Sequence, residues 1–150
     1  MTPSRTDTSG RGGICHLSAA RTASTNGFGT ITVKVGATAT LQARLLVTVP
    51  LTITCTLPVG STVNSDLARL NVQEAVSRSI TAGSGSPNPD GSFACDGATY
   101  AYMVQVQSST VPWHGGQAVV NAGVGACGFL ADSSFQCTSV ETGSLIIRIR

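Results

Sequence analysis

Histidines, cysteines and acidic residues are the side chains of this chain that could carry catalytic or metal-binding chemistry, and we compared their spacing with known motifs. The two histidines, His16 and His114, stand outside the HExxH, HxH and Cys/His spacings typical of metal sites. The chain has no phosphate-binding loop, no GxGxxG following a strand and no GxSxG nucleophile elbow. No two of the seven acidic residues lie where alternating strands would pair two carboxylates, and EF-hand spacing is absent. The sequence therefore predicts a non-enzymatic protein with no catalytic residue, no metal and no cofactor.

The five cysteines are scattered along the chain without CxxC spacing, which is typical of a disulfide framework and not of a metal site. Two pairs drawn from five thiols can be arranged in many ways, so the sequence does not determine the pairing. We adopt Cys55–Cys95, which would link distant segments across the core, and Cys127–Cys137, which would staple one hairpin or loop. Cys15 is then left as a free thiol, the partner of a different cysteine, or the half of an intermolecular bond.

Composition excludes two further classes of function. Charged residues make up 11% of the chain and the formal net charge is +2, whereas ordinary soluble domains carry about 25% charged residues. Without a basic stripe or interleaved basic and aromatic residues, we expect no nucleic-acid partner. No apolar run reaches the roughly 18 residues of a membrane helix, so we expect no membrane span.

The first 30 residues lack the apolar segment of a signal peptide. Two interpretations fit: a cytosolic protein, or a mature secreted form with an added initial methionine. The cysteines favour the second, because disulfides persist in oxidising compartments. We therefore expect a secreted, extracellular protein.

Alternating apolar and polar residues predict β-strands through most of the chain from Thr30 onward. The strongest alternation runs from Val47 to Leu57, with threonines on the outward face. Pro50 interrupts it and, having no N–H, should lie at an edge, a bulge or a break between two strands. About six to eight such strands, separated by Gly, Pro and Asn turns, predict an all-β fold, an antiparallel β-sandwich over residues 30–150.

Residues 66–80 are ambiguous, because apolar residues recur there at helical spacing and also alternate. We favour a strand, since an isolated helix would be unusual in this setting. The following segment, Thr81–Ser92, contains the run GSGSPNPDG and is predicted to be a loop. Long ordered loops are often functional, so its tip, Asn88, Pro89 and Asp90, is a candidate partner contact.

Two other segments could contact a partner. Residues 1–29 are polar and Gly-rich and are predicted to be a flexible N-terminal arm distinct from the sandwich. The arm could add a strand to a sheet edge or fill a groove, using its one apolar patch, Ile14, Cys15, His16 and Leu17.

The turn at Trp113 and His114 is the second such segment, because tryptophan brings a large rigid surface with a polar handle. The competing interpretation is that Trp113 packs into the core at the end of a strand.

Several short motifs resemble a known group of proteins over roughly residues 45–125. These are LTITCT at 51–56, VQ at 72–73, FACDG at 93–97, YMVQV at 102–106 and GQA at 116–118. The chain is similar to small secreted proteins of filamentous actinobacteria that have an immunoglobulin-like sandwich. Within that group it resembles the adaptor subunit of umbrella toxin particles. The resemblance implies a disulfide between Cys55 and Cys95.

In that family a secreted adaptor links lectin-bearing subunits to the spokes of a large toxin protein. The resemblance thus implies a non-enzymatic adaptor with other secreted proteins as its partners, within a larger extracellular toxin-like assembly. An extension ahead of the sandwich fits such a connector, and so does the Cys127/Cys137 loop.

Two alternatives stay open. One is a secreted carrier of an apolar small molecule, like the chromoprotein apoproteins, with a cleft lined by Tyr100, Tyr102, Met103, Trp113 and Phe129. The other is a capsid or decoration protein, which would explain the missing signal peptide.

Overall fold

A computed structural model describes residues 20–24 and 27–150 of the chain. These residues form ten strands, and no helix occurs among them. The strands are β1 (Ala20–Ser24), β2 (Thr30–Val35), β3 (Thr38–Gln42), β4 (Leu46–Thr56), β5 (Thr62–Val76), β6 (Ser79–Gly85), β7 (Thr99–Gln107), β8 (Gly116–Phe129), β9 (Phe135–Glu141) and β10 (Leu145–Ile149).

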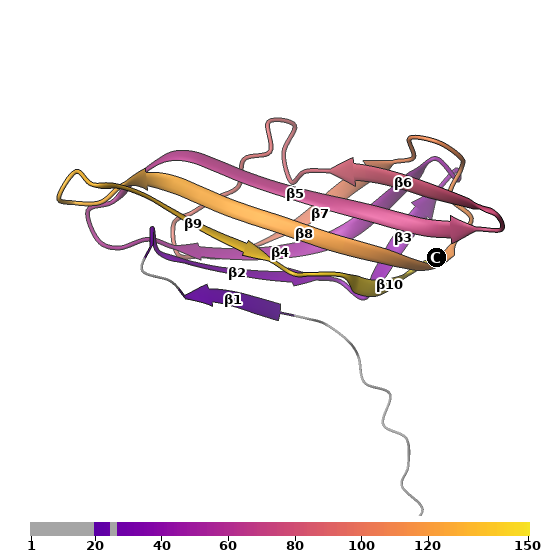
Figure 1. The fold of residues 1–150 in the computed structure, drawn as a ribbon, viewed down its shortest axis with the longest axis horizontal. Coiled ribbons are helices and arrows are strands. Elements are labelled where there is room, and N and C mark those ends of the chain that lie inside the picture. Colours follow the sequence, from indigo (N-terminus) through magenta and orange to yellow (C-terminus); the bar gives the residue numbers. More distant parts are fainter. Residues whose placement is uncertain (1–19, 25–26) are drawn as a thin grey trace, which may run out of the picture.

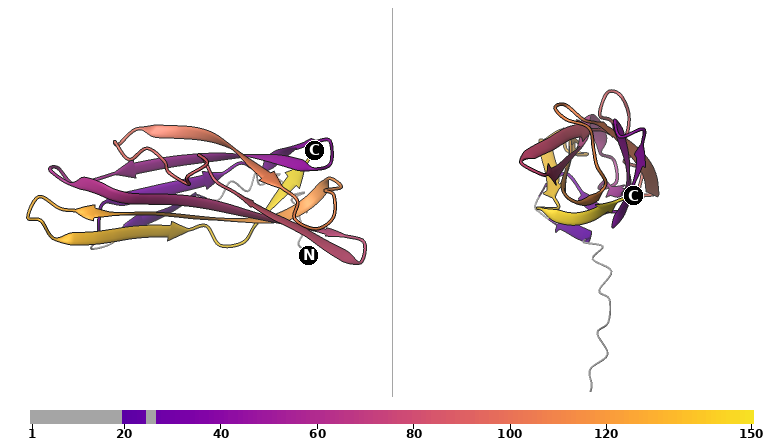
Figure 2. Two further views of the ribbon diagram at one scale, coloured as in Figure 1. Left: turned by 90° about the horizontal axis from the view of Figure 1, so that it is seen from above. Right: turned by 90° about the vertical axis from the view of Figure 1, so that its right-hand side faces the viewer.

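The strands form two layers around one core (Figure 1). In the first, β4 lies between β7 on one side and β2 followed by β3 on the other, and β1 pairs with β2. In the second, β8 lies between β5 and the successive strands β9 and β10, and β6 pairs with β5. These pairings are antiparallel, and a short parallel pairing of β3 with β10 joins the layers along one side. The right-hand view of Figure 2 looks along the long axis of the molecule and shows the strands curving around the interior.

The predicted all-β, antiparallel sandwich is confirmed. The finer immunoglobulin-like designation stays a prediction. Immunoglobulin domains of antibodies join their two sheets by a disulfide between strands, whereas Cys55 of β4 bonds here to Cys95 in the segment that precedes β7.

Strand β4 shows how the alternating pattern builds the core. Its apolar side chains, from Val47 through Cys55, are almost completely buried, and most of the intervening threonines lie nearer the surface. Pro50 does not divide the strand, so the prediction of a possible break at this residue is wrong. The break lies in the partner: β2 ends opposite Leu51 and β3 begins pairing at Thr48. The Pro50 carbonyl accepts a bond from the Gly36 N–H in that gap, where no ladder donor is needed from proline.

The strand interpretation of residues 66–80 is confirmed for β5 and the start of β6, which are joined by a turn at residues 77–78. The loop prediction over Thr81–Ser92 is wrong for residues 81–85, which complete β6. The glycines that suggested a loop have a different use, because Gly83 and Gly85 face the backbone of β7. A Cβ at either position would collide with a β7 carbonyl oxygen, that of Gln107 or Gln105.

The sandwich also begins earlier in the chain than the predicted boundary between residues 29 and 30. Residues 20–24 pair with β2 as an edge strand, and Phe28 is completely buried in the core. The arm patch at residues 14–17, including Cys15, lies outside the described residues. None of the described residues forms a helix of the length and apolarity needed to cross a membrane.

Candidate protein-interaction site

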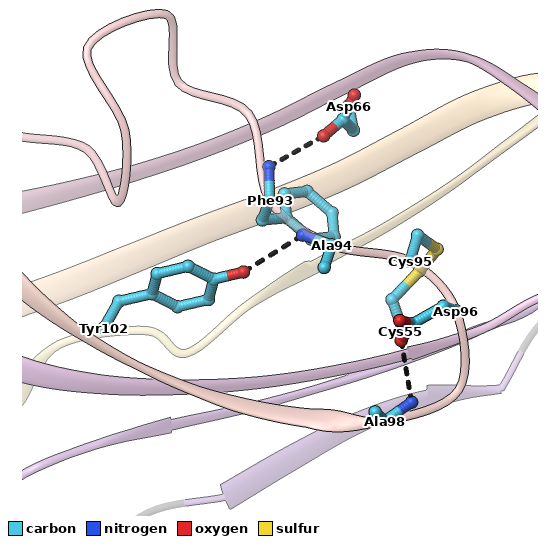
Figure 3. Close-up of a disulfide and its surroundings, with 8 residues drawn as sticks. All are labelled: Cys55, Asp66, Phe93, Ala94, Cys95, Asp96, Ala98 and Tyr102. Carbon is cyan, nitrogen blue, oxygen red and sulfur yellow. Dashed lines mark hydrogen bonds between the residues drawn. A yellow bond between two sulfur atoms is a disulfide. The ribbon is translucent and has the colours of Figure 1, made fainter.

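The segment between β6 and β7, residues 86–98, crosses from the second layer to the first and carries three of the predicted contact residues, Asn88, Pro89 and Asp90. We call it the crossover loop. Its second half is fixed to both layers (Figure 3). Cys95 bonds to Cys55 of β4, and the Phe93 N–H donates to the Asp66 carboxylate of β5 at 2.7 Å. The Ala94 N–H donates to the Tyr102 hydroxyl of β7 at 3.0 Å, so three different strands hold the loop.

The tip of the crossover loop is exposed yet internally bonded. Asn88, Pro89 and Asp90 are all exposed. The Asn88 side-chain amide donates to the Ser92 carbonyl at 2.8 Å, and the Ser92 hydroxyl donates to the Asp90 carboxylate at 2.7 Å. Gly91 turns the chain at φ +82°, a conformation that glycine adopts without strain. The tip therefore presents fixed polar groups to solvent.

A hollow of about 430 Å³ lies beside this tip. Its walls are Ser86 to Pro89 from the loop, with Met103 and Gln105 from β7. Met103 has 61% of its surface exposed, which is high for a large apolar side chain. The tip and the hollow together form a surface with both polar and apolar groups, as protein interfaces have.

The hydrogen bonds of Ser92 also set the acidity of Asp90. The Ser92 hydroxyl, and secondly the Ser92 N–H, lower the pKa of Asp90 below its ordinary value of 3.8. A lowered folded-state pKa means that the carboxylate's contribution to loop order is fully present above pH 3.8. It is lost as the pH falls through the lower, folded-state value.

We expect Ser92→Ala to raise the pKa of Asp90 back toward 3.8, because the hydroxyl is the leading cause of its depression. A carbon-detected NMR titration of the Asp90 carboxyl measures this. Ser134→Ala is the matched control, since Ser134 lowers the pKa of Asp132 by the same contacts at the β8–β9 turn. An Asp90 titration that is the same in the Ser92→Ala variant and the parent would contradict the assignment.

Trp113 and His114 are adjacent in the β7–β8 connection, but they differ in burial. Trp113 is completely buried, so its predicted partner contact is wrong and the core interpretation holds. His114 is exposed, and its N–H donates to the buried Glu74 carboxylate of β5 at 2.9 Å. His114 therefore remains available at the surface, at the opposite end of β7 from Cys95.

The five residues proposed to line a carrier cleft are not brought together. Trp113 lies in the core and Met103 faces solvent beside the crossover loop. Phe129 stacks edge to face on Phe135 at the β8–β9 turn, with ring centroids 5.2 Å apart. Tyr100 and Tyr102 instead bond to the crossover loop, at Asp96 and Ala94. The predicted cleft is thus absent from the described part of the chain.

A second surface was not anticipated from the sequence. On the outward side of the second layer, Gly123 and Gly125 of β8 leave a hollow of about 460 Å³ between β5 and β9. We call this hollow the trough. Glycines two residues apart in an alternating strand were its only sequence signal, and such glycines mark places where another backbone can approach closely.

The Cys127–Cys137 bond lies at one end of the trough and joins directly paired residues of β8 and β9. Both adopted disulfide pairings are therefore confirmed. Within residues 20–24 and 27–150, no three His, Cys, Asp or Glu side chains gather as metal ligands would.

In comparisons with known proteins, no family model, no curated protein and no solved structure matches the chain.

Proposed function

We propose that this protein is a non-enzymatic, secreted adaptor that holds together protein subunits of a larger extracellular assembly. The observation that carries the proposal is the crossover loop, whose second half is fixed to three strands by a disulfide and hydrogen bonds. Its exposed tip is ordered by its own hydrogen bonds to Ser92. Loops held by a rigid scaffold are the usual place for recognition residues. A tip that is already ordered loses little conformational entropy on binding.

The two disulfides support the extracellular part of the proposal, because such bonds persist in oxidising compartments. One of them includes the exposed Cys137, which a reducing cytosol would reach directly. The resemblance to adaptors of umbrella toxin particles suggests the kind of assembly, with a lectin-bearing subunit and a large toxin subunit as partners. An adaptor needs two separate contacts, and we assign these to the crossover loop and to the arm patch at residues 14–17.

The test is capture of partners from the culture supernatant of the producing organism by the immobilised full chain. A triple change of the tip, Asn88→Ala, Pro89→Ala and Asp90→Ala, should abolish capture of one partner. Removal of residues 1–19, which leaves β1 intact, should abolish capture of a different one. Asp132→Ala at the exposed β8–β9 turn is the matched control and should retain both.

Two outcomes would contradict the adaptor. Capture that is unchanged in both variants would exclude the assigned contacts. A single small molecule that co-purifies, seen as a fixed added mass by native mass spectrometry with no captured protein, would favour the carrier instead.

A further inference from the structure

The outward side of the second layer has the composition of a contact surface. We call it the outer face, and it is formed by the outward side chains of β5, β8, β9 and β10. Five large apolar side chains on it are 43% to 61% exposed, namely Leu67, Val119, Phe129, Phe135 and Ile146. An exposed apolar surface of this kind, with polar residues between, is typical of a protein–protein contact.

The trough lies in the middle of the outer face and is flanked by opposite charges. Arg69 of β5 and Glu141 of β9 are both paired with Gly123 of β8, so the three residues are level across the sheet. Both charged side chains are exposed, and the Arg69 guanidinium donates to the Ser84 hydroxyl at 3.1 Å. Two residues further along β8, at its next outward-facing position, Gly125 lies between Leu67 of β5 and Ser139 of β9 in the same way.

This arrangement is self-complementary about a single kind of two-fold axis. An axis along β8 in the plane of contact places β5 of one copy over β9 of the other. Arg69 then faces Glu141 of the second copy, and the reciprocal pair forms by symmetry. An axis across the strands would instead place Arg69 over Arg69 and Glu141 over Glu141, which like-charge repulsion disfavours.

The glycines suit the same geometry. Packed sheets lie about 10 Å apart because side chains separate them, and Gly123 and Gly125 have none. Two β8 strands can therefore approach more closely over the trough than elsewhere. We propose that two copies of this protein associate through their outer faces, with the two-fold axis along β8 and reciprocal Arg69–Glu141 ion pairs.

The outer face is large enough for such a dimer. Three strands lie abreast on it, because β9 and β10 follow one another along the same side of β8. At about 4.8 Å spacing they span roughly 14 Å, and the 14 residues of β8 span roughly 45 Å. Their product is of the order of the ~800 Å² that each partner buries in a standard interface. The association does not depend on the proposed function, although a dimer would present two crossover loops to an assembly.

The test measures self-association of the full chain by sedimentation velocity over a range of concentrations. The parent and every variant carry Cys15→Ser, so that an intermolecular Cys15 bond does not contribute. We expect Arg69→Glu and Glu141→Arg each to weaken the dimer about tenfold or more, because each creates two like-charge contacts. The double variant R69E/E141R should recover most of the parent affinity. Arg78→Glu, at the exposed β5–β6 turn, is the control for net charge and should leave the dimer unchanged.

A second variant tests the close approach independently of charge. A Cβ at Gly123 would meet nothing nearer than 3.9 Å, so Gly123→Gln should fold normally and fill the trough. It should weaken the dimer while leaving the thermal unfolding of the monomer unchanged.

Several results would overturn the proposal. These are a monomer at every concentration, a dimer indifferent to either charge reversal, and a double variant that does not recover. A monomer whose outer-face amides exchange faster once residues 1–19 are removed would also overturn it, because the chain's own N-terminal segment would then occupy the trough.

Discussion

Replacement of Trp113 by alanine is expected to lower the free energy of unfolding by about 3–5 kcal/mol, the usual cost of truncating a buried aromatic residue. Among the described residues, Trp113 has the largest fully buried side chain. Aromatic residues make up only 5% of the chain. No other side chain of that size is available to fill the space that alanine would leave. The cost should therefore lie in the upper part of the range.

The backbone around Trp113 adds to the effect. Its N–H donates to the Arg44 carbonyl at 2.8 Å, and the Arg44 side chain donates back to the Trp113 carbonyl at 3.3 Å. Arg44 and Ala43 have positive φ values of 59° and 47° in the β3–β4 turn, which is unfavourable for residues other than glycine. Loss of the indole packing should loosen this paired turn as well.

Urea denaturation measures the effect, with Trp113→Phe and His114→Ala as comparisons. Phenylalanine keeps much of the apolar packing and removes an indole N–H that has no partner among the described residues. It should therefore cost clearly less than alanine. The exposed His114 side chain should contribute about 0.5 kcal/mol or less. If Trp113→Ala and His114→Ala were equally mild, the core position of Trp113 would be contradicted.

Removal of the Cys55–Cys95 bond by Cys55→Ala and Cys95→Ala is expected to destabilise the protein by about 4 kcal/mol. The two cysteines are 40 residues apart in the chain, so the bond restricts a long loop of the unfolded state. The Cys127–Cys137 bond spans only 10 residues and its removal should cost about 3 kcal/mol on the same chain-entropy argument. The two double variants are therefore matched controls for each other.

The two variants should also differ in where the structure loosens. Without Cys55–Cys95, amides of the crossover loop should exchange faster, because the bond anchors the loop to β4. Without Cys127–Cys137, the faster exchange should lie at the β8–β9 turn. Hydrogen exchange followed by mass spectrometry distinguishes the two patterns. Equal stability losses with faster exchange in the same region would contradict this account.

The alternating strands could be predicted because their signal is local. The pattern around Val47–Leu57 repeats every two residues, and burial of one face follows directly from it. The two pairings agreed with the structure, although the sequence also allowed others. The exposed tip at Asn88, Pro89 and Asp90 was found by its turn residues.

The errors have a common physical cause. Gly83 and Gly85 suggested a loop, yet they are required because β6 packs against the backbone of β7, far along the chain. Trp113 was predicted as a partner contact, with a core position as the alternative, because the sequence does not show that the β7–β8 connection turns this side chain inward. The start of the sandwich was placed too late because the sequence of residues 20–24 does not show that they pair with β2.

By itself, the sequence determined that this protein is all-β, which residues of the strand around Val47–Leu57 face the core, and where the turn at the tip of the crossover loop falls. These properties depend on the pleat of a strand and on the φ preferences of Gly, Pro, Asn and Asp, which act over a few residues. Only the tertiary structure decided that Arg69, Gly123 and Glu141 lie level on one surface. Their juxtaposition depends on the register of three strands. Register is determined by packing between separate segments, β5 with β8 and β8 with β9, and not by any one of them.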